Sequence, residues 1–560
     1  MIGSPRSNAR LPLRLGGFDN LRQALDYAAQ GRTGVDFHDV RGVLVQSLDY
    51  AGLRRRARVA AAHMRAMGMR QGDRLALIAD TSVAFLTAFY GAQYAGVVPC
   101  PLPYQALPGG RDAYTAQLAA LLAASGAPWL LSPQATLACA QAAAFTAGAR
   151  AQGLETLDAP PPLITLPPVD ADIPAYIQFS SGSTAMPKGV VVRQQALMAN
   201  VDAIAVHGLR MRADDRACSW LPLYHDMGLV GFSVVAMCAQ RSVDYLPPHA
   251  FAARPQAWLQ LMSRQRTSIV YAPGFAWRLA AQRGAAMAAE LDLSALRVAG
   301  VGGEPVRDDD LLAFSQALAP AGFRHDAFQP SYGLAEATLA VSMAAPDAAP
   351  RARAIPAPHG GGGRRLLGCG RPLPGTEVRV LDAAGRDLPE RRVGHLWVRG
   401  PAVMQRYLQE AAGGPRADGF LDTGDLGFLD EGELFISGRA KDMILVRGRN
   451  LWPQDIEAAA AAAGALAPRD VAAFGVEREG GEYVVVLAEC RTGSEGRQQL
   501  RARIDEALAA AFGIRAEVLA VPRRSLPFTT SGKPARARAR ALYLAGHWAP
   551  DSLDEKELTA

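Results

Sequence analysis

The chain has 560 residues, of which 49% are hydrophobic and 20% are charged. This length exceeds what one hydrophobic core can organise, so we expect two or more domains. The net charge of +6 is spread over a long chain without a basic stripe interleaved with aromatic residues, which argues against a nucleic-acid-binding protein. The six cysteines are far apart and form no CxxC pair, which argues against a disulfide framework or a cysteine-rich metal site.

Two features of the sequence favour a cytoplasmic protein. The first 15 residues contain basic side chains but no apolar run behind them, so they do not resemble a signal peptide. The longest apolar run, near residues 229–239, is too short to span a bilayer, so we expect no transmembrane segment.

The first recognisable block, residues 48–103, alternates between helix and strand. Apolar residues at helical spacing predict a helix over 53–67, and residues 75–78 form a short buried strand. A second helix is predicted over 82–94, and a second strand follows residues 96–99. This alternation is typical of parallel β-α-β units and indicates scaffold rather than chemistry.

A stretch rich in glycine and hydroxyl side chains follows at residues 176–190. A strand over 176–179 breaks into Ser-Ser-Gly-Ser-Thr at 180–184, and a strand resumes after Lys188. Such a loop can turn several backbone N–H groups toward one anion, and Lys188 adds a positive charge. The usual P-loop is followed by a helix, whereas a strand follows here. From the loop alone, a polyphosphate site and a flexible surface connection are both open.

Polar residues recur at three later points of the chain. His225 and Asp226 lie on a predicted loop between apolar runs, where side chains can face a cleft, although a buried core histidine is the alternative. Glycines at 302 and 303 let a flat base approach the backbone. The ring of Tyr332 can stack on adenine, and a carboxylate four residues later can bind Mg²⁺.

The last part of the chain is predicted to be strand-rich and then α+β. Alternating residues predict strands over 377–381 and 395–399. Beyond residue 443, helices over 454–466 and 500–512 and strands over 471–474 and 483–487 indicate a small α+β domain.

Six motifs in this order resemble the acyl-adenylate-forming (AMP-binding) superfamily over about residues 48–543. They are the loop at 176–190, the His-Asp block at 219–231, the Tyr-Gly-x-x-Glu motif at 332–336, Asp-Thr-Gly-Asp-Leu at 422–426, the hinge at 437–443 and the Lys motif at 526–534. The His-Asp block resembles fatty acyl-AMP ligases more closely than it does the wider superfamily.

The resemblance implies an α/β fold in two domains. The expected N-terminal AMP-binding domain spans residues 1–438 and has several subdomains, with parallel β-α-β sheets and a small β-barrel-like part. A small mobile α+β domain spans 439–545, and a polar tail spans 546–560. Lys441 is the expected swivel residue between the domains.

The resemblance also implies ATP and Mg²⁺ as cofactors and assigns the site residues. Lys533, Lys188 and His225 are the expected catalytic residues, with Lys533 bridging the attacking carboxylate and the α-phosphate. Glu336 and Thr184 are the expected Mg²⁺ ligands. The expected ATP-binding residues are Ser181, Gly182, Ser183, Thr184, Lys188, Gly303, Glu304, Tyr332, Gly333, Asp425, Arg439 and Lys533.

The expected reaction is ATP-dependent activation of a medium- or long-chain fatty acid to acyl-AMP, with transfer to the phosphopantetheine thiol of an acyl carrier protein. An acyl- or aryl-CoA synthetase that transfers the acyl group to CoA is the alternative. A non-catalytic nucleotide-binding relative is a third possibility, against which Lys533, Glu336 and Lys188 argue. Fatty acyl-AMP ligases carry an insertion near residues 340–367 that is thought to restrain the C-terminal domain. The segment here is longer than in compact acyl-CoA synthetases and shorter than a typical insertion, so the acceptor stays open, as do the chain length and the oligomeric state.

Overall fold

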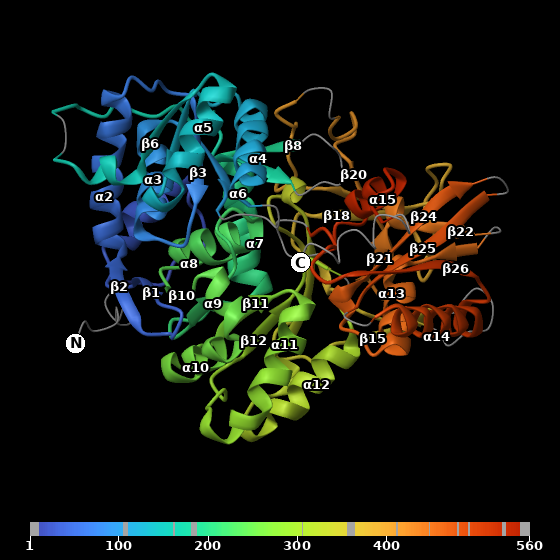
Figure 1. The fold of residues 1–560 in the computed structure, drawn as a ribbon. Coiled ribbons are helices and arrows are strands. Elements are labelled where there is room, and N and C mark those ends of the chain that lie inside the picture. The colour runs from blue at the N-terminus through green and yellow to red at the C-terminus, as the bar shows by residue number, and fades with distance from the viewer. Residues whose placement is uncertain are drawn as a thin grey trace.

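The computed structural model describes residues 11–104, 110–160, 163–180, 188–304, 306–355, 364–409, 413–446, 449–478, 481–490, 493–528 and 534–548. In Figure 1 the chain forms a large body, coloured blue to yellow, and a smaller orange-to-red body beside it. Within the described ranges, no helix is long and apolar enough to cross a membrane.

The first part of the large body is a parallel four-stranded sheet with helices on both faces. In spatial order its strands are β4 (Val98–Pro103), β3 (Arg74–Ala79), β5 (Trp129–Ser132) and β6 (Arg150–Gly153), and its helices are α2 (Tyr50–Ala66), α3 (Val83–Ala95), α4 (Gly110–Ser125) and α5 (Leu137–Ala147). Leu75 and Leu77 of β3 pack with α2 and α3, whereas Ala76 and Ile78 pack with α4 and α5. A sheet that is covered on both faces requires this alternation. The predicted β-α-β units are confirmed.

The second part is a nine-stranded sheet. In spatial order its strands are β17 (Arg371–Pro372), β14 (Ala340–Met343), β13 (Phe328–Gly333), β12 (Val298–Val301), β11 (Ile269–Ala272), β9 (Arg216–Ser219), β10 (Ser242–Tyr245), β1 (Gly34–His38) and β2 (Leu44–Asp49). The six strands from β13 to β1 are parallel, and the other three add antiparallel edges. The carboxyl ends of the parallel strands therefore meet at one edge of the sheet, where α/β proteins place their ligands.

Helices cover both faces of this sheet. They are α1 (Leu21–Ala28), α6 (Gln194–Asp202), α8 (Val235–Cys238), α9 (Pro248–Ala253), α10 (Pro255–Gln265), α11 (Gly274–Gly284) and α12 (Asp308–Leu318). The ring of Trp277 lies 5.0–5.2 Å from those of Trp258, Phe314 and Phe328, which joins α10, α11 and α12 to β13. Helix α6 continues as a π-helix, η3 (Ala203–Gly208).

Three antiparallel pieces follow the sheets or lie beside them. The phosphate-loop stretch is flanked by the hairpin strands β7 (Tyr176–Ser180) and β8 (Lys188–Val192). The part expected to resemble a β-barrel is a four-stranded antiparallel sheet of β18 (Glu377–Leu381), β19 (Gly394–Arg399), β20 (Leu421–Asp430) and β21 (Glu433–Arg439). A further hairpin pairs β15 (Ala352–Ile355) with β16 (Arg364–Leu367).

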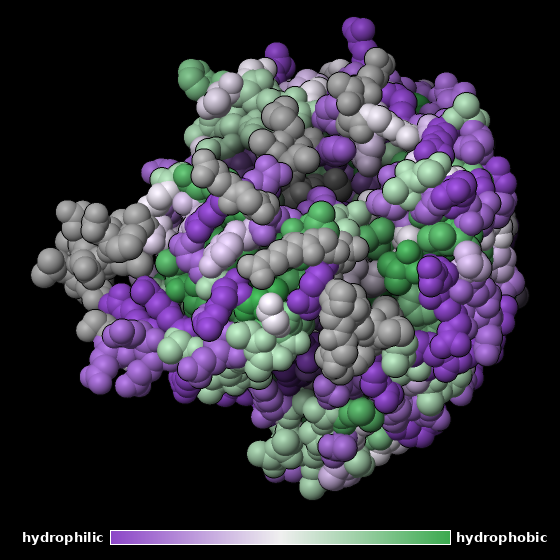
Figure 2. Space-filling model, turned by 90° about the vertical axis from the view of Figure 1, so that its right-hand side faces the viewer, coloured by the Kyte–Doolittle hydropathy of each residue, from purple (hydrophilic) through white to green (hydrophobic). Residues whose placement is uncertain are grey.

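The smaller body is an α+β unit with its own cores. It contains β22 (Ile444–Val446), β23 (Arg449–Leu451), α13 (Pro453–Gly464), β24 (Val471–Arg478), β25 (Gly481–Cys490), α14 (Ser494–Phe512), β26 (Ala516–Pro522) and α15 (Arg536–Leu544). Val484 and Val486 of β25 pack with α13 and α14, while Val485 and Leu487 pack toward α15. Figure 2 views the side on which this body lies and shows hydrophilic residues interspersed with smaller hydrophobic patches.

The apolar cores of the two bodies share no described residue. The core of the large body extends to Leu434, and those of the smaller body begin at Ile444. The predicted boundary between residues 438 and 439 falls in this interval and stays a prediction.

Candidate active site

A continuous cleft runs from the carboxyl ends of the large sheet to the smaller body. Its lining includes Lys188 of β8, Tyr332 of β13 and Asp425 of β20. It continues past Arg439 of β21 to Arg536 of α15, which belongs to the smaller body. The cleft therefore gathers residues from three sheets and from both bodies.

Tyr332, Asp425 and Arg439 form one hydrogen-bonded group in this cleft. The Tyr332 hydroxyl donates to Asp425 Oδ2 at 2.6 Å, and Arg439 Nε pairs with Asp425 Oδ1 at 2.9 Å. The β20–β21 register places Asp425 opposite Arg439, and Gly424 takes a positive φ of 69° just before the carboxylate. Burial and the Asp425 charge raise the pKa of Tyr332, and the same carboxylate raises the pKa of Arg439. Three predicted nucleotide residues are thus in direct contact.

Lys188 and Glu336 meet through a residue that the sequence did not single out. The Tyr407 hydroxyl donates to Glu336 Oε1 at 2.8 Å, and Lys188 Nζ lies 5.1 Å from the centroid of the Tyr407 ring. Tyr407 is 8% exposed, and both burial and the Glu336 carboxylate raise the pKa of its hydroxyl. Tyr407 therefore contacts a cation with its ring and a carboxylate with its hydroxyl, which holds the two charges near each other.

The backbone around Tyr407 ties three pieces of the site together. The Met404 amide donates to the Glu336 carbonyl at 2.7 Å, and the Leu408 amide donates to the Gly189 carbonyl at 2.6 Å. The Gln409 side chain accepts from the Gly189 amide and donates to a carbonyl of α4. We call residues 402–409 the strap. Seventy-one residues separate Tyr407 from Glu336, so no local pattern could have revealed the contact.

His225 lies in a bend directly before a helical segment that begins at Asp226, whereas we expected both residues on a loop. Residues 226–228 form α7 (Asp226–Gly228), and the π-helix η4 (Leu229–Val234) continues into α8. A Cβ at Gly228 would lie 2.2 Å from the Pro222 carbonyl oxygen, so only glycine allows this tight entry. His225 is half-buried and lines the cleft, and Gln178 of β7 donates to the neighbouring Tyr224 carbonyl at 2.8 Å. This placement differs from that of a fully buried core histidine.

The glycine-rich turn after β12 has a structural role that the sequence reasoning missed. A Cβ at Gly302 would lie 2.9 Å from the Ser331 carbonyl oxygen, so this glycine accommodates the neighbouring strand. Gly303 has a positive φ of 78° and lines the cleft. Glu304 accepts the Phe275 amide at 2.9 Å, which engages its carboxylate at the N-terminus of α11.

Gly333 and Lys441 complete the described site residues. A Cβ at Gly333 would lie 1.8 Å from the Leu339 carbonyl oxygen, at an irregularity between β13 and β14. Lys441 lies in the short 3₁₀ turn η10 (Ala440–Asp442) and lines the cleft, where burial and the Arg439 charge lower its pKa.

Several predicted site residues lie outside the described residues, namely Ser181, Gly182, Ser183, Thr184 and Lys533. Described residues on either side of them line the cleft: Phe179 and Lys188 near the first group, and Phe528 and Pro534 near Lys533.

The described carboxylates fit a nucleotide-bound Mg²⁺ rather than a protein-held metal. Across the described ranges, no group of three or more His, Cys, Asp or Glu side chains is placed to hold a metal ion. Glu336 offers its carboxylate at the cleft, next to Lys188. One or two carboxylates suffice for Mg²⁺ when substrate phosphates and water supply the other ligands.

Comparisons with known proteins agree with this geometry. The AMP-binding enzyme family model matches residues 29–408. A protein of Caulobacter vibrioides, provisionally named acyl-CoA synthetase, is 43% identical over 95% of this chain and 97% of its own length. The medium-chain-fatty-acid–[acyl-carrier-protein] ligase JamA of Moorena producens is 31% identical over 90% of each chain.

A solved structure extends the likeness to both bodies. It comes from a study of fatty acyl-adenylate ligases of E. coli and L. pneumophila, and it superimposes with a TM-score of 0.90 at 37% identity, covering 96% of this chain and 100% of the other. The chain belongs to the AMP-binding enzyme family and is an ATP-dependent ligase that adenylates carboxylates.

Proposed function

We propose that this enzyme activates a fatty acid as acyl-AMP, with release of pyrophosphate, and passes the acyl group to the phosphopantetheine thiol of an acyl carrier protein. The observation that carries the adenylation step is the contact between Tyr332, Asp425 and Arg439 in the cleft that Lys188 and Glu336 also line. This arrangement offers an aromatic ring, a carboxylate for ribose hydroxyls and two cations within one cavity.

Charge explains why such a site needs these side chains. A fatty acid carboxylate must attack the α-phosphorus of ATP, and both reactants are anions. A fixed positive field lowers this barrier without any rearrangement of solvent. We infer that Lys188 faces the phosphates together with residues 181–184, while Glu336 and Thr184 hold Mg²⁺, which neutralises phosphate charge when bound.

The remaining site residues complete the proposal. Asp425 accepts the ribose hydroxyls, and Arg439 orients that carboxylate through its ion pair. Lys533 bridges the attacking carboxylate and the α-phosphate. His225 lines the same cleft and faces the acyl carboxylate.

The acceptor is the second part of the proposal. The names of JamA and of the fatty acyl-adenylate ligases favour a carrier protein, whereas the provisional name of the Caulobacter relative favours CoA as the second candidate. The β15–β16 hairpin lies in the segment that differs between the two classes. It is fixed to the antiparallel sheet by the Arg353–Asp430 ion pair at 2.5 Å, and to α12 by the Arg365–Asp308 pair at 3.0 Å.

Mass spectrometry of the products separates these acceptors. The enzyme is incubated with ATP, Mg²⁺, a ladder of fatty acids and either CoA or a phosphopantetheinylated carrier protein. We expect acyl-AMP to accumulate with CoA and to be consumed with the carrier protein. Efficient formation of acyl-CoA would contradict the carrier-protein proposal and favour the CoA alternative.

A further inference from the structure

An apolar arm of the cleft runs along one face of the nine-stranded sheet. It starts at the carboxyl ends of the strands, near Gly302 and Ser331, and follows β11 back to Ile269. Residues of η3, η4 and α8 also line it. The side chains that line it are Ile204, Leu209, Met211, Ala217, Phe232 and Val235.

Tyr271 lies flat on the sheet in the middle of this arm. A Cβ at Gly300 would be 2.1–2.2 Å from three atoms of the Tyr271 ring. The ring therefore occupies the space that the side chain of any other residue at position 300 would need. The Tyr271 hydroxyl donates to Gln329 Oε1 at 2.7 Å, and the Gln329 amide donates to the Gly208 carbonyl at 2.8 Å. This arrangement keeps the ring down and leaves the arm open beyond it.

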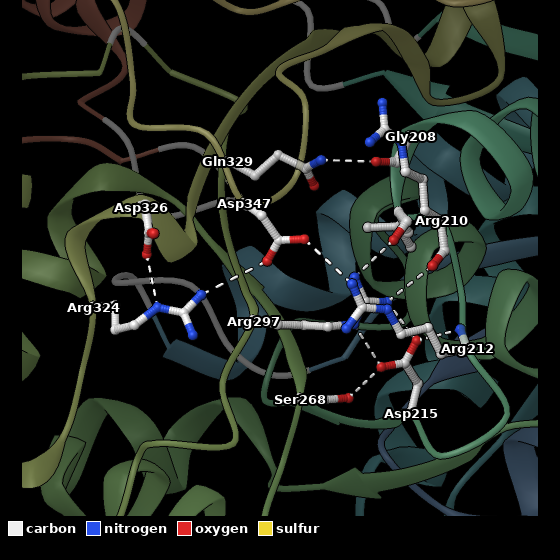
Figure 3. Close-up of polar contacts among 11 residues, drawn as sticks. Gly208, Arg210, Arg212, Asp215, Ser268, Arg297, Arg324, Asp326, Gln329 and Asp347 are labelled. Carbon is white, nitrogen blue, oxygen red and sulfur yellow. Dashed lines mark hydrogen bonds and ion pairs between the residues drawn. The ribbon is translucent and has the colours of Figure 1, made fainter.

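The inner end of the arm is a short segment held by one arginine. Leu209 and Met211 line the end, and both are buried. Arg297 donates to the Leu209 carbonyl at 2.9 Å and to the Arg210 carbonyl at 3.3 Å. Figure 3 shows the same guanidinium directed at Asp215.

Asp215 anchors the other end of this segment. Its carboxylate accepts the Arg212 amide at 2.6 Å and the Ser268 hydroxyl at 2.7 Å. Arg297 and Asp215 are both at least nine-tenths buried, so the pair is rigid. An exposed layer lies outside it, in which Arg212 and Arg324 pair with Asp347 (Figure 3).

We propose that this arm is an acyl tunnel with a closed end, that it selects medium-chain fatty acids, and that Arg297 is the positioning residue that fixes its end. This inference rests on the proposed adenylation of fatty acids. From Ala272 to Ile269 the strand advances three residues, or about 10 Å, which matches an extended chain of about eight to ten carbons. A longer acid would have to displace Leu209 and Met211, which the buried Arg297–Asp215 pair opposes.

The test measures acyl-AMP formation for acids of 6 to about 18 carbons, with no thiol acceptor present. The wild-type kcat/KM is highest for acids of about 8 to 10 carbons and falls by about tenfold or more at hexadecanoate, because overpacking is costly. Met211→Ala shortens the end wall, so hexadecanoate gains about tenfold relative to octanoate. Gly300→Ala lifts the Tyr271 ring into the arm, so the preference moves toward shorter acids.

A matched variant separates length selection from general damage. Met262→Ala removes an equally buried methionine that does not line the arm, so the length profile keeps its shape. Arg297→Lys keeps the charge but loses the forked contacts, and we expect the profile to broaden toward long acids. The inference is wrong if Met211→Ala and Gly300→Ala both show the same chain-length profile as the wild-type enzyme. It is also wrong if hexadecanoate is the best substrate of the wild-type enzyme.

Calorimetric binding of octanoate and hexadecanoate to the full chain without ATP gives a second readout. If the wild-type enzyme binds octanoate more tightly than hexadecanoate and Met211→Ala reverses this order, the closed tunnel is supported. This holds even if no acid is adenylated, because the absence of adenylation would contradict only the proposed function. Equal binding of both acids by the two enzymes would contradict the tunnel.

Discussion

The two halves of the cleft are built in different ways. In the half on the large body, contacts between distant segments hold the side chains in place. Tyr407 of the strap contacts both Lys188 and Glu336. Asp425 contacts Tyr332 of β13 and Arg439 of β21. The half on the smaller body belongs to a unit with separate apolar cores. There, Arg536 of α15 pairs with Glu457 at 2.7 Å and with Asp442 of the connecting turn at 3.3 Å. A cleft wall held together by these contacts therefore faces a unit whose sequence carries the 526–534 motif.

The largest effect should come from the motif on the smaller body. We expect Lys533→Ala to slow acyl-AMP formation by about 10²–10³, the usual cost of losing one preorganised contact to a transition-state charge. ATP–pyrophosphate exchange measures this step directly. A rate within a few-fold of the wild-type value would remove Lys533 from the chemistry. The chain contains only four lysines, at 188, 441, 533 and 556, so each can be replaced in turn and its effect on the exchange rate compared with that of Lys533→Ala.

A backbone change at the connection should separate the two half-reactions. Lys441→Pro fixes φ in the turn where the bodies join, so adenylation should stay within about threefold while thiol transfer slows by about 10², the cost of a misplaced reactant. Single-turnover measurements of each step test this. Equal losses in both steps would refute a hinge at this position.

The strap predicts a smaller and more specific defect in the large body. Tyr407→Phe keeps the ring under Lys188 and removes only the hydrogen bond to Glu336, so we expect a loss of about tenfold in kcat/KM. The Mg²⁺ concentration needed for half-maximal ATP binding should rise, which calorimetry can measure without turnover. Tyr407→Leu also removes the ring and should increase labelling of Lys188 by an amine-reactive reagent. Unchanged Mg²⁺ dependence in Tyr407→Phe would show that the hydroxyl has only a packing role.

The smallest effect concerns stability and should be confined to one body. Burial raises the pKa of Asp80 to about 6, above its ordinary value of 3.8. The folded state therefore favours the protonated carboxyl, and stability falls as the pH rises from about 4 to 6. Asp80→Asn should raise the free energy of unfolding by about 1–2 kcal/mol at pH 7 and by little at pH 4.

Scanning calorimetry can assign this gain to a body. Asp80 follows β3, so the transition of the large body should move while that of the smaller body stays. A shift of both transitions together would mean that the two bodies unfold as one unit.

The sequence predicts those parts that depend on local pattern. The β-α-β alternation around β3 follows from hydrophobic periodicity, as does the helix predicted over 500–512. That helix begins earlier, at Ser494, because its first turn is polar and carries no apolar period. The loop predicted for His225 and Asp226 ends at His225, because Asp226 begins a helix whose continuation, η4, is apolar and shows no amphipathic pattern in the sequence.

Contacts between distant residues could not be predicted in this way. Tyr407, Arg297 and Asp215 stand in stretches without a motif, and each has a partner at least 70 residues away in the sequence. Glu304 has the residue type expected at a nucleotide site, yet its carboxylate is held by the Phe275 amide at the start of α11. Only the tertiary arrangement identifies these partners.

The most direct test is fatty-acid-dependent exchange of pyrophosphate into ATP by the full chain, without any thiol acceptor. We expect exchange that requires Mg²⁺ and is fastest with acids of about 8 to 10 carbons, a length set by the rise of β11. No exchange with any fatty acid, in an enzyme that still binds ATP, would contradict this expectation.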